Sequence, residues 1–298
     1  ILSVAVILVM VLGIFYFLFV LSLFAQDHKR IDAIRMYGLN KTNPLVVQRE
    51  FLVWEGDVFD AAAFEESIQR LWNTQLFWKI DHKIITKNES VEIELSLAES
   101  WTIIPLIRFV GAGSTLLWVG GLYDVNFLGR YLEIGALYQS LGGLPSYGVW
   151  FTDPRFLGKR LKLNTEAAYD RRIRLLYSPD TQADAEKPVG GFILQRTRIV
   201  ENLTYEISPI CFLLFGLEWN QDQLSTNKLS QEVLEGNSRN KLPPTHEGRA
   251  LIARTGVTMG RMDRQKFVMY GLQSKLTLEK SFETPVSDLD FERLQWQT

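Results

Sequence analysis

The sequence predicts a small α+β module followed by an antiparallel β-barrel that spans a membrane. Three observations predict it: an uncharged apolar segment at 1–25, mixed helical and strand periodicity at 30–98, and alternating segments of about ten residues beyond 116. Apolar and polar residues that alternate over about ten residues are typical of transmembrane barrel strands, whereas soluble strands usually run about 5–6 residues. A soluble β-sandwich or jelly roll also alternates, but the strand length favours the membrane barrel.

The composition excludes several classes of protein. Lys and Arg number 32 and Asp and Glu number 34, so the net charge is −2, which argues against a nucleic-acid partner. Cys211 is the single cysteine, so neither an intrachain disulfide nor a zinc–cysteine cluster is possible. The three histidines, His28, His82 and His246, are far apart in the sequence. No pattern of nucleophile and base has supporting context, so we expect no enzyme, no metal and no cofactor.

Residues 1–26 are either a secretory signal or a membrane anchor. The uncharged run is long enough for the bilayer core, which needs about 20 apolar residues, and it exceeds the usual signal core of about 7–15. The charged and polar residues Asp27 to Arg30 end it. On length alone both interpretations stay open.

The stretch 27–98 predicts one β-α-α-β-β module. A first strand at 31–37 is broken by Gly38, and Asn43 with Pro44 is typical of a helix start. Asp60 caps a second helix whose apolar stripe is Phe64, Ile68 and Leu71. Two strands follow, at 77–86 and 91–97; in the second, Val91, Ile93, Leu95 and Leu97 alternate with polar residues.

The module resembles a POTRA domain, the polypeptide-transport-associated module of outer-membrane assembly proteins. The resemblance is carried by Gly38, Lys41, Thr42, Arg49-Glu50, Gly56, Asp57, Arg70-Leu71, Asn73-Thr74 and Leu76-Phe77. It implies structural rather than catalytic roles for Gly38, Lys41, Thr42, Gly56, Asp57, Leu71, Asn73 and Phe77. Leu39 stands where the family usually has Asn, and Gln75 replaces a usual Gly. Thr74 or Gln75 must therefore adopt the left-handed conformation that ends the second helix.

The remaining chain predicts the barrel. The alternating segments are 131–140, 161–170, 211–220, 251–260 and 270–279. Tyr138, Tyr169, Trp219 and Tyr270 lie near segment ends, where an interfacial aromatic girdle is expected. Charged residues such as Glu166 and Lys275 are expected to face the lumen. Polar stretches at 178–191 and 221–248 are interpreted as long outward loops, and 142–145 as a short periplasmic turn.

Two segments resemble the barrel of the BamA-like surface-antigen family. Residues 121–130 are similar to its first hairpin, and 151–158 to the aromatic-Asp-Pro stretch that ends its third strand. The motif residues are Gly121, Asp124, Asn126, Gly129, Asp153, Pro154 and Arg155. Asp153 could pair with an arginine, but a strand-end turn at Pro154 is favoured.

The resemblance implies a barrel of sixteen strands, of which residues 116–298 hold about nine at roughly twenty residues per strand and turn. We therefore expect an incomplete barrel after a linker at 99–115, with 116–127 as its first strand. A POTRA-preceded barrel must cross the inner membrane, so the resemblance favours a cleaved signal at 1–26 over an anchor.

The resemblance also implies a function in the outer membrane, with the POTRA module in the periplasm. An assembly or translocation factor would engage unfolded β-rich clients by β-augmentation of the POTRA sheet and at a seam between the first and last barrel strands. The implied partners are outer-membrane lipid, the client and accessory periplasmic or lipoprotein partners, without nucleic acid. The alternative is a passive pore or surface antigen with no client. A membrane-bound enzyme would need a hydrolase domain before the barrel, and 1–115 supplies none.

Overall fold

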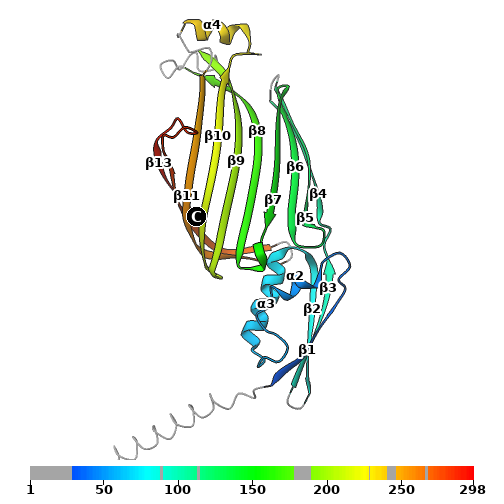
Figure 1. Cartoon of the computed structure of the whole chain (residues 1–298). Coiled ribbons are helices and arrows are strands. Elements are labelled where there is room, and N and C mark those ends of the chain that lie inside the picture. The colour runs from blue at the N-terminus through cyan, green and yellow to red at the C-terminus, as the bar shows by residue number, and fades with distance from the viewer. Residues whose placement is uncertain are drawn as a thin grey trace, which may run out of the picture.

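The computed structural model describes residues 29–87, 90–112, 115–177, 189–227, 229–239, 246–265 and 268–298. They form a three-stranded sheet with two helices, here called the module, and a ten-stranded sheet above it, here called the large sheet (Figure 1). The predicted signal or anchor and most of the predicted loop at 178–191 lie outside the described residues. Within the described ranges, no helix has the length and apolar character needed to cross a membrane.

The module has the predicted β-α-α-β-β order. Its elements are β1 (Arg30–Tyr37), α2 (Pro44–Gln48), α3 (Ala61–Thr74), β2 (Phe77–Lys87) and β3 (Ser90–Glu99). The strand order is β1-β3-β2, in which β3 pairs parallel with β1 and antiparallel with β2.

Local capping chemistry fixes where both helices begin and where α3 ends. The Asn43 side chain accepts a hydrogen bond from the Leu45 amide at 2.9 Å, and Asp60 accepts one from the Ala62 amide at 2.8 Å. Gln75 has φ 63° and is the left-handed residue that ends α3. The expected strained position after the helix is therefore confirmed, and Gln75 takes it without the usual glycine.

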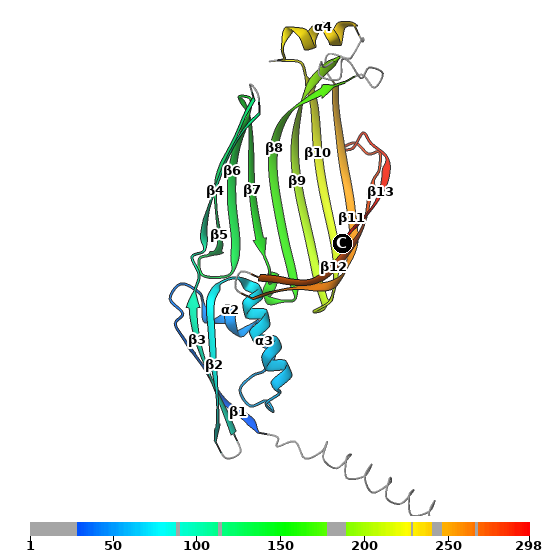
Figure 2. The same ribbon diagram turned by 180° about the vertical axis from the view of Figure 1, so that it is seen from behind.

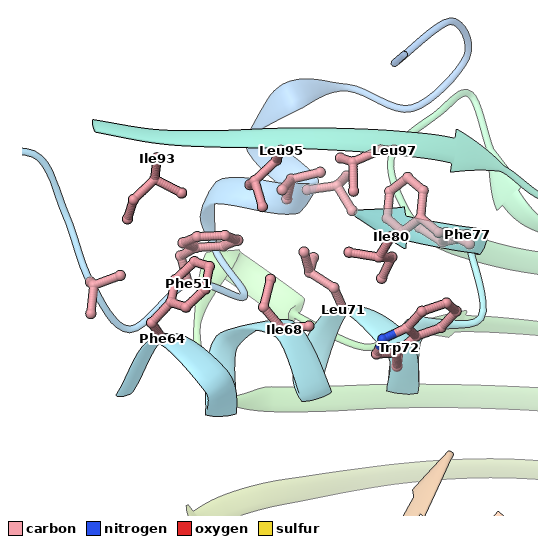
Figure 3. Close-up of a cluster of buried hydrophobic side chains, with 14 of the residues drawn as sticks. Phe51, Phe64, Ile68, Leu71, Trp72, Phe77, Ile80, Ile93, Leu95 and Leu97 are labelled. Carbon is pink, nitrogen blue, oxygen red and sulfur yellow. The ribbon is translucent and has the colours of Figure 1, made fainter. Parts of the chain in front are cut away.

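The core of the module lies between α3 and one face of the sheet. The predicted stripe of α3 and the alternating residues of β3 meet there, as Figure 3 shows. Phe64 and Leu71 are fully buried, and so are Ile93 and Leu95. The apolar residues that recur at helical spacing on α3 therefore face the apolar residues that alternate along β3.

The large sheet is a meander in which each strand pairs antiparallel with the next. Its strands are β4 (Ile103–Ala112), β5 (Thr115–Phe127), β6 (Leu132–Leu141), β7 (Leu144–Asp153), β8 (Leu161–Leu176), β9 (Gly190–Ser208), β10 (Cys211–Ser225), β11 (His246–Gln265), β12 (Val268–Ser281) and β13 (Phe291–Gln297). In the described part of the chain, β4 and β13 are its two edge strands (Figure 2).

Two sequence predictions about this sheet are wrong. The described part of 116–298 holds nine strands, β5 to β13, as predicted, but a tenth strand, β4, occupies most of the predicted linker at 99–115. The first strand is therefore β4, and the segment 116–127 belongs to β5, which lies between β4 and β6. The sequence Ile-Ile-Pro-Leu-Ile-Arg-Phe-Val of β4 is almost wholly apolar, so it lacks the alternation that marked the other strands.

The additional strand also changes the side on which the turns lie. The chain leaves the module along β4 and returns along β5, so the turn at 142–145 lies at the end remote from the module. The Gly142 amide there donates to the Leu116 carbonyl at 2.9 Å. The prediction of a periplasmic turn at 142–145 is therefore wrong. The predicted loop at 221–248 is only partly a loop, because it includes the end of β10, the helix α4 (Gln231–Arg239) and the start of β11.

The two faces of the large sheet differ in chemistry as the alternation predicted. One face carries exposed apolar residues such as Phe215 and Leu217, together with a row of rings on β5 to β8. The ring centroids are 4.7 Å apart for Trp118–Tyr138, 5.3 Å for Tyr138–Tyr147 and 6.3 Å for Tyr147–Tyr169. Tyr270 is an exception, because it lies at the tip of the β11–β12 hairpin and contacts α3 instead.

The opposite face, here called the inner face, carries paired charges. Glu166 pairs with Arg198, and Arg254 donates to Glu218 and to Glu279, each at 2.7 Å. Glu279 is buried, and its pairing satisfies a carboxylate that would be costly to bury alone.

We expect Leu71→Ala to lower the free energy of unfolding of the module by about 2–5 kcal/mol, because it leaves a cavity in a fully buried site. Urea unfolding of the intact protein, followed by the fluorescence of the buried Trp72, measures this. Leu45→Ala is the control, since Leu45 is also helical but 65% exposed, and it should change the free energy by less than about 0.5 kcal/mol. Equal losses in both variants would contradict this placement of the core.

Candidate functional site at the junction of the two sheets

The first part of the junction is a loop of the module held by a single carboxylate. The loop at 38–43 follows β1, and the Glu99 side chain at the end of β3 accepts hydrogen bonds from the amides of Lys41 at 2.9 Å and Thr42 at 2.7 Å. Burial acts to raise the pKa of Glu99, but these amides outweigh it and lower that pKa below its ordinary value. Glu99 therefore stays ionised and orders the loop.

The ordered loop is bound by the β5–β6 end of the large sheet. The Lys41 ammonium donates to Thr102 at 2.7 Å and to Asp124 at 2.9 Å. The Thr42 hydroxyl accepts from the buried Asn126 side chain at 2.9 Å. Asn126 in turn accepts from the Tyr131 amide at 2.8 Å, which fixes its orientation. The motif residues of the module and those of the first hairpin are thus direct partners.

Gly129 allows the closest backbone approach across the junction. Its carbonyl accepts from the Asn43 amide at 2.8 Å, and its φ is 70°. A Cβ atom at this position would lie 2.0 Å from the Lys41 carbonyl oxygen, a distance that no side chain can occupy. Only glycine satisfies both the left-handed conformation and the contact.

The second part of the junction is a chain of ion pairs centred on Arg155. Its guanidinium donates to Glu50 of the module at 2.7 Å and to Glu206 of β9 at 2.8 Å. Burial opposes the charge on Arg155, but the hydrogen bonds to Glu50 and Glu206 prevail and raise the pKa of the guanidinium above its ordinary value. Glu206 also accepts from Arg70 of α3 at 2.9 Å.

The third part joins α3 to the tip of the β11–β12 hairpin. Arg261 donates to Glu66 at 2.7 Å, and the Asn73 side chain donates to Asp263 at 2.9 Å. The hairpin bends toward α3 near Gly260 and Gly271, whose φ values are 96° and 124°. Figure 2 shows β12 running across the foot of the large sheet to reach the helix.

The structure gathers most of the predicted motif residues at this junction and leaves others elsewhere. Those at or next to the junction are Gly38, Lys41, Thr42, Asn73, Asp124, Asn126, Gly129 and Arg155. Leu71 and Phe77 belong to the core, Gly121 packs within β5 against β6, and Gly56 and Asp57 form a turn beside β1. The Asp153 side chain accepts a hydrogen bond from the Arg155 amide at 2.9 Å. Asp153 therefore forms the strand-end turn that the sequence predicts at Pro154.

The junction carboxylates that sequence reasoning missed include Glu99, Glu206 and Asp263. Each binds a partner remote in the chain; Glu99 lies 58 residues from Lys41, and Asp263 lies 190 residues from Asn73. A charged residue at a strand end is common in any sheet, so no local pattern distinguishes these three.

Comparison with known proteins identifies the two sheets. No family model matches the chain. It is 27% identical over 171 residues to the outer membrane protein assembly factor BamA of Nitratidesulfovibrio vulgaris, and 24% identical over 168 residues to a relative from Treponema pallidum. These matches cover 54% and 53% of the chain but 21% and 20% of the relatives, so the chain spans about a fifth of their length.

A solved structure shows the same fold. The crystal structure of BamA from Haemophilus ducreyi lacking POTRA domains 1–3 matches with a TM-score of 0.57 at 16% identity, over 89% of this chain and 50% of that one. The module thus corresponds to a POTRA domain and the large sheet to part of a BamA barrel.

The chain is thus similar to BamA-like proteins in part of its sequence and in its fold. It shares with the matched structure a POTRA domain followed by barrel strands. The turn at 142–145 and helix α4 lie at the end of the large sheet that is remote from the POTRA module.

We expect Gly129→Ala to loosen the junction, because the new Cβ would overlap the Lys41 carbonyl. Overpacking of this kind costs about 1–3 kcal/mol. Hydrogen exchange of the Asn43 amide, which donates to Gly129, should then accelerate. Gly143→Ala is the matched control, since Gly143 has φ 77° but open space around it. If Gly143→Ala accelerated exchange at Asn43 equally, the close approach would not be the cause.

The stability contributed by Glu99 should depend on pH with a defined sign. A carboxyl whose pKa is lower in the folded state stabilises the fold above its unfolded pKa of about 4.3, and this stability is lost as the pH falls through the lower, folded pKa. We therefore expect the Lys41 and Thr42 amides to lose protection against hydrogen exchange, measured relative to their intrinsic rates at each pH, on acidification below about pH 4.3. Glu99→Gln should show fast exchange at neutral pH and lose this acid dependence. A variant that kept the wild-type pH profile would contradict the assignment.

Proposed function

We propose that this chain is part of an outer-membrane assembly or translocation factor that engages unfolded β-rich clients. The proposal places the client at two free strand edges, one in the POTRA sheet and one in the barrel sheet. It needs no nucleotide or cofactor, because the folding free energy of the client would drive the step. Accessory periplasmic or lipoprotein partners belong to the same proposal.

The observation that carries the proposal is the difference between the two edges of the POTRA sheet. The outer side of the first half of β1 is covered by the segment 55–59. The Ile31 amide donates to the Asp57 carbonyl at 2.9 Å, the Gly56 amide donates to the Ile31 carbonyl at 2.8 Å, and the Ile34 amide donates to the Glu55 side chain at 2.9 Å. Strand β2 pairs with β3 alone among the described residues. Its second edge therefore offers unpaired backbone groups to an added strand.

The side chains around β2 suit an extended apolar client. Trp78 and Ile84 on this strand are 58% and 40% exposed, which is unusual for residues of their size. His82 packs edge-on against Phe64 of α3, with ring centroids 5.0 Å apart. The added strand would thus gain main-chain hydrogen bonds from β2 and side-chain contacts beside α3.

Strand β4 supports the second half of the proposal. It pairs with β5 alone among the described residues, and Pro105 within it has no amide hydrogen to donate. Ile107 and Phe109 are 73% and 70% exposed. An edge with a proline forms a weaker ladder, so a seam at β4 could open to a client strand at low cost.

A photo-crosslinking residue at Lys83 on β2 should capture a newly exported β-barrel client in the periplasm. The same residue at Asp32 on β1 should not, because the segment 55–59 covers that edge. Both positions are exposed, so accessibility alone does not distinguish them. Client capture at both positions, or at neither, would contradict augmentation at β2.

The passive pore remains the second candidate because of the charged inner face. Pairs such as Glu166–Arg198 would suit a water-filled lumen. Steady single-channel conductance of the purified protein, with no assembly defect on its depletion, would favour the pore. An assembly defect on depletion would exclude it as the sole function.

A further inference from the structure

A cavity of about 250 Å³ lies inside the junction, between α3, the β7–β8 turn, β9 and the β11–β12 hairpin. Charged residues from both sheets line it. The carboxylates are Glu50, Glu66 and Glu206, and the cations are Arg70, Arg155, Arg160, Lys162 and Arg261. The lining therefore carries five positive and three negative charges, an excess of two positive charges.

The three carboxylates of the cavity are already occupied. Glu66 accepts from Arg70 at 3.2 Å and from Arg261 at 2.7 Å. Glu206 accepts from Arg70 at 2.9 Å and from Arg155 at 2.8 Å. Both oxygens of Glu50 accept from Arg155. Three arginines and three carboxylates of the lining thus form one continuous network with no free carboxylate. Arg261 extends the network by donating to Asp263, outside the lining, at 2.6 Å.

Arg160 and Lys162 account for the excess charge. Within the described residues, neither side chain has a hydrogen bond or an ion pair, and both are exposed. Arg160 directly precedes β8 and Lys162 is the second residue of β8, so the two positions are two residues apart and fall on the same face. They stand opposite the network, because Lys162 pairs in register with Thr204, and the Glu206 amide donates to the Arg160 carbonyl at 2.9 Å.

We propose that this cavity binds a phosphate group, either as inorganic phosphate or as a phosphate monoester. A phosphate monoester carries about −1.5 to −2 charges at neutral pH, which the two cations Arg160 and Lys162 would balance. The planar guanidinium of Arg160 suits two phosphate oxygens, and Lys162 supplies a second, compact charge. A single water needs about 10–15 Å³ of such space, so the cavity has room for a substituted phosphate with its hydration.

Binding of inorganic phosphate to the intact protein in detergent micelles tests the proposal. Isothermal titration calorimetry is run against chloride at matched ionic strength. We expect Arg160→Gln and Lys162→Gln each to weaken phosphate binding about tenfold, the loss of one hydrogen bond to a charged group. Lys159→Gln is the matched control, because Lys159 is adjacent and exposed but does not line the cavity, and it should leave the affinity within about twofold.

Two results would overturn the phosphate site: no phosphate binding to the wild-type protein beyond that of chloride, or equal weakening by Lys159→Gln and Arg160→Gln. The source of the phosphate is assigned by two further probes. Competition by glycerol phosphate indicates a soluble monoester, whereas retention of phosphatidic acid over phosphatidylcholine from nanodiscs indicates a lipid headgroup. These measurements do not involve a client, so they stand apart from the crosslinking at Lys83.

Discussion

The pairing of backbone groups within lipid is the constraint on which the rest of this structure depends. A strand in the hydrocarbon core must find partners for its N–H and C=O groups within the protein. The ten strands satisfy this by pairing each with its neighbour in the chain, from β4 to β13. The faces of every strand and the side of every turn follow from that order. The described residues thus place unpaired edges only at the two ends, and the POTRA module stands beside the first of them.

The POTRA module could be predicted from local patterns, because the segments with periodic apolar residues are the ones that pack together in its core. Phe64 and Leu71 on α3, like Ile93 on β3, repeat at the periods of their elements, and Asp60 caps α3 from the adjacent position. Strand β4 escaped prediction because its apolar residues do not alternate. The residues of the junction could be recognised in the sequence as members of motifs, but their contacts with one another could not. Lys41 and Asp124 are 83 residues apart, and no periodicity links them.

The charges of the junction fix an orientation rather than add much stability. Removing charges from water is expensive, and an ion pair in a buried site recovers that cost only with good geometry. Here every carboxylate oxygen of Glu50 and Glu206 accepts a hydrogen bond from a guanidinium, which is the good geometry that a buried ion pair needs. Loss of a single partner such as Arg155 would leave buried charge unpaired, at a cost of about 3–5 kcal/mol. An alternative orientation of the module would incur the same cost, and the network therefore selects one.

Helix α3 connects the two proposed activities. Its side chains Glu66, Arg70 and Asn73 recur at intervals of three and four residues, so they form one stripe directed to the barrel. Phe64 reaches β2 through His82, on the side where a client strand would add. A helix of 14 residues is about 21 Å long, so α3 reaches from β2 to the barrel as one continuous element. A shift of α3 caused by a client at β2 would therefore alter the cavity, and an anion in the cavity would favour one position of α3. Because such coupling is reciprocal, phosphate and client should each change the affinity for the other by the same factor.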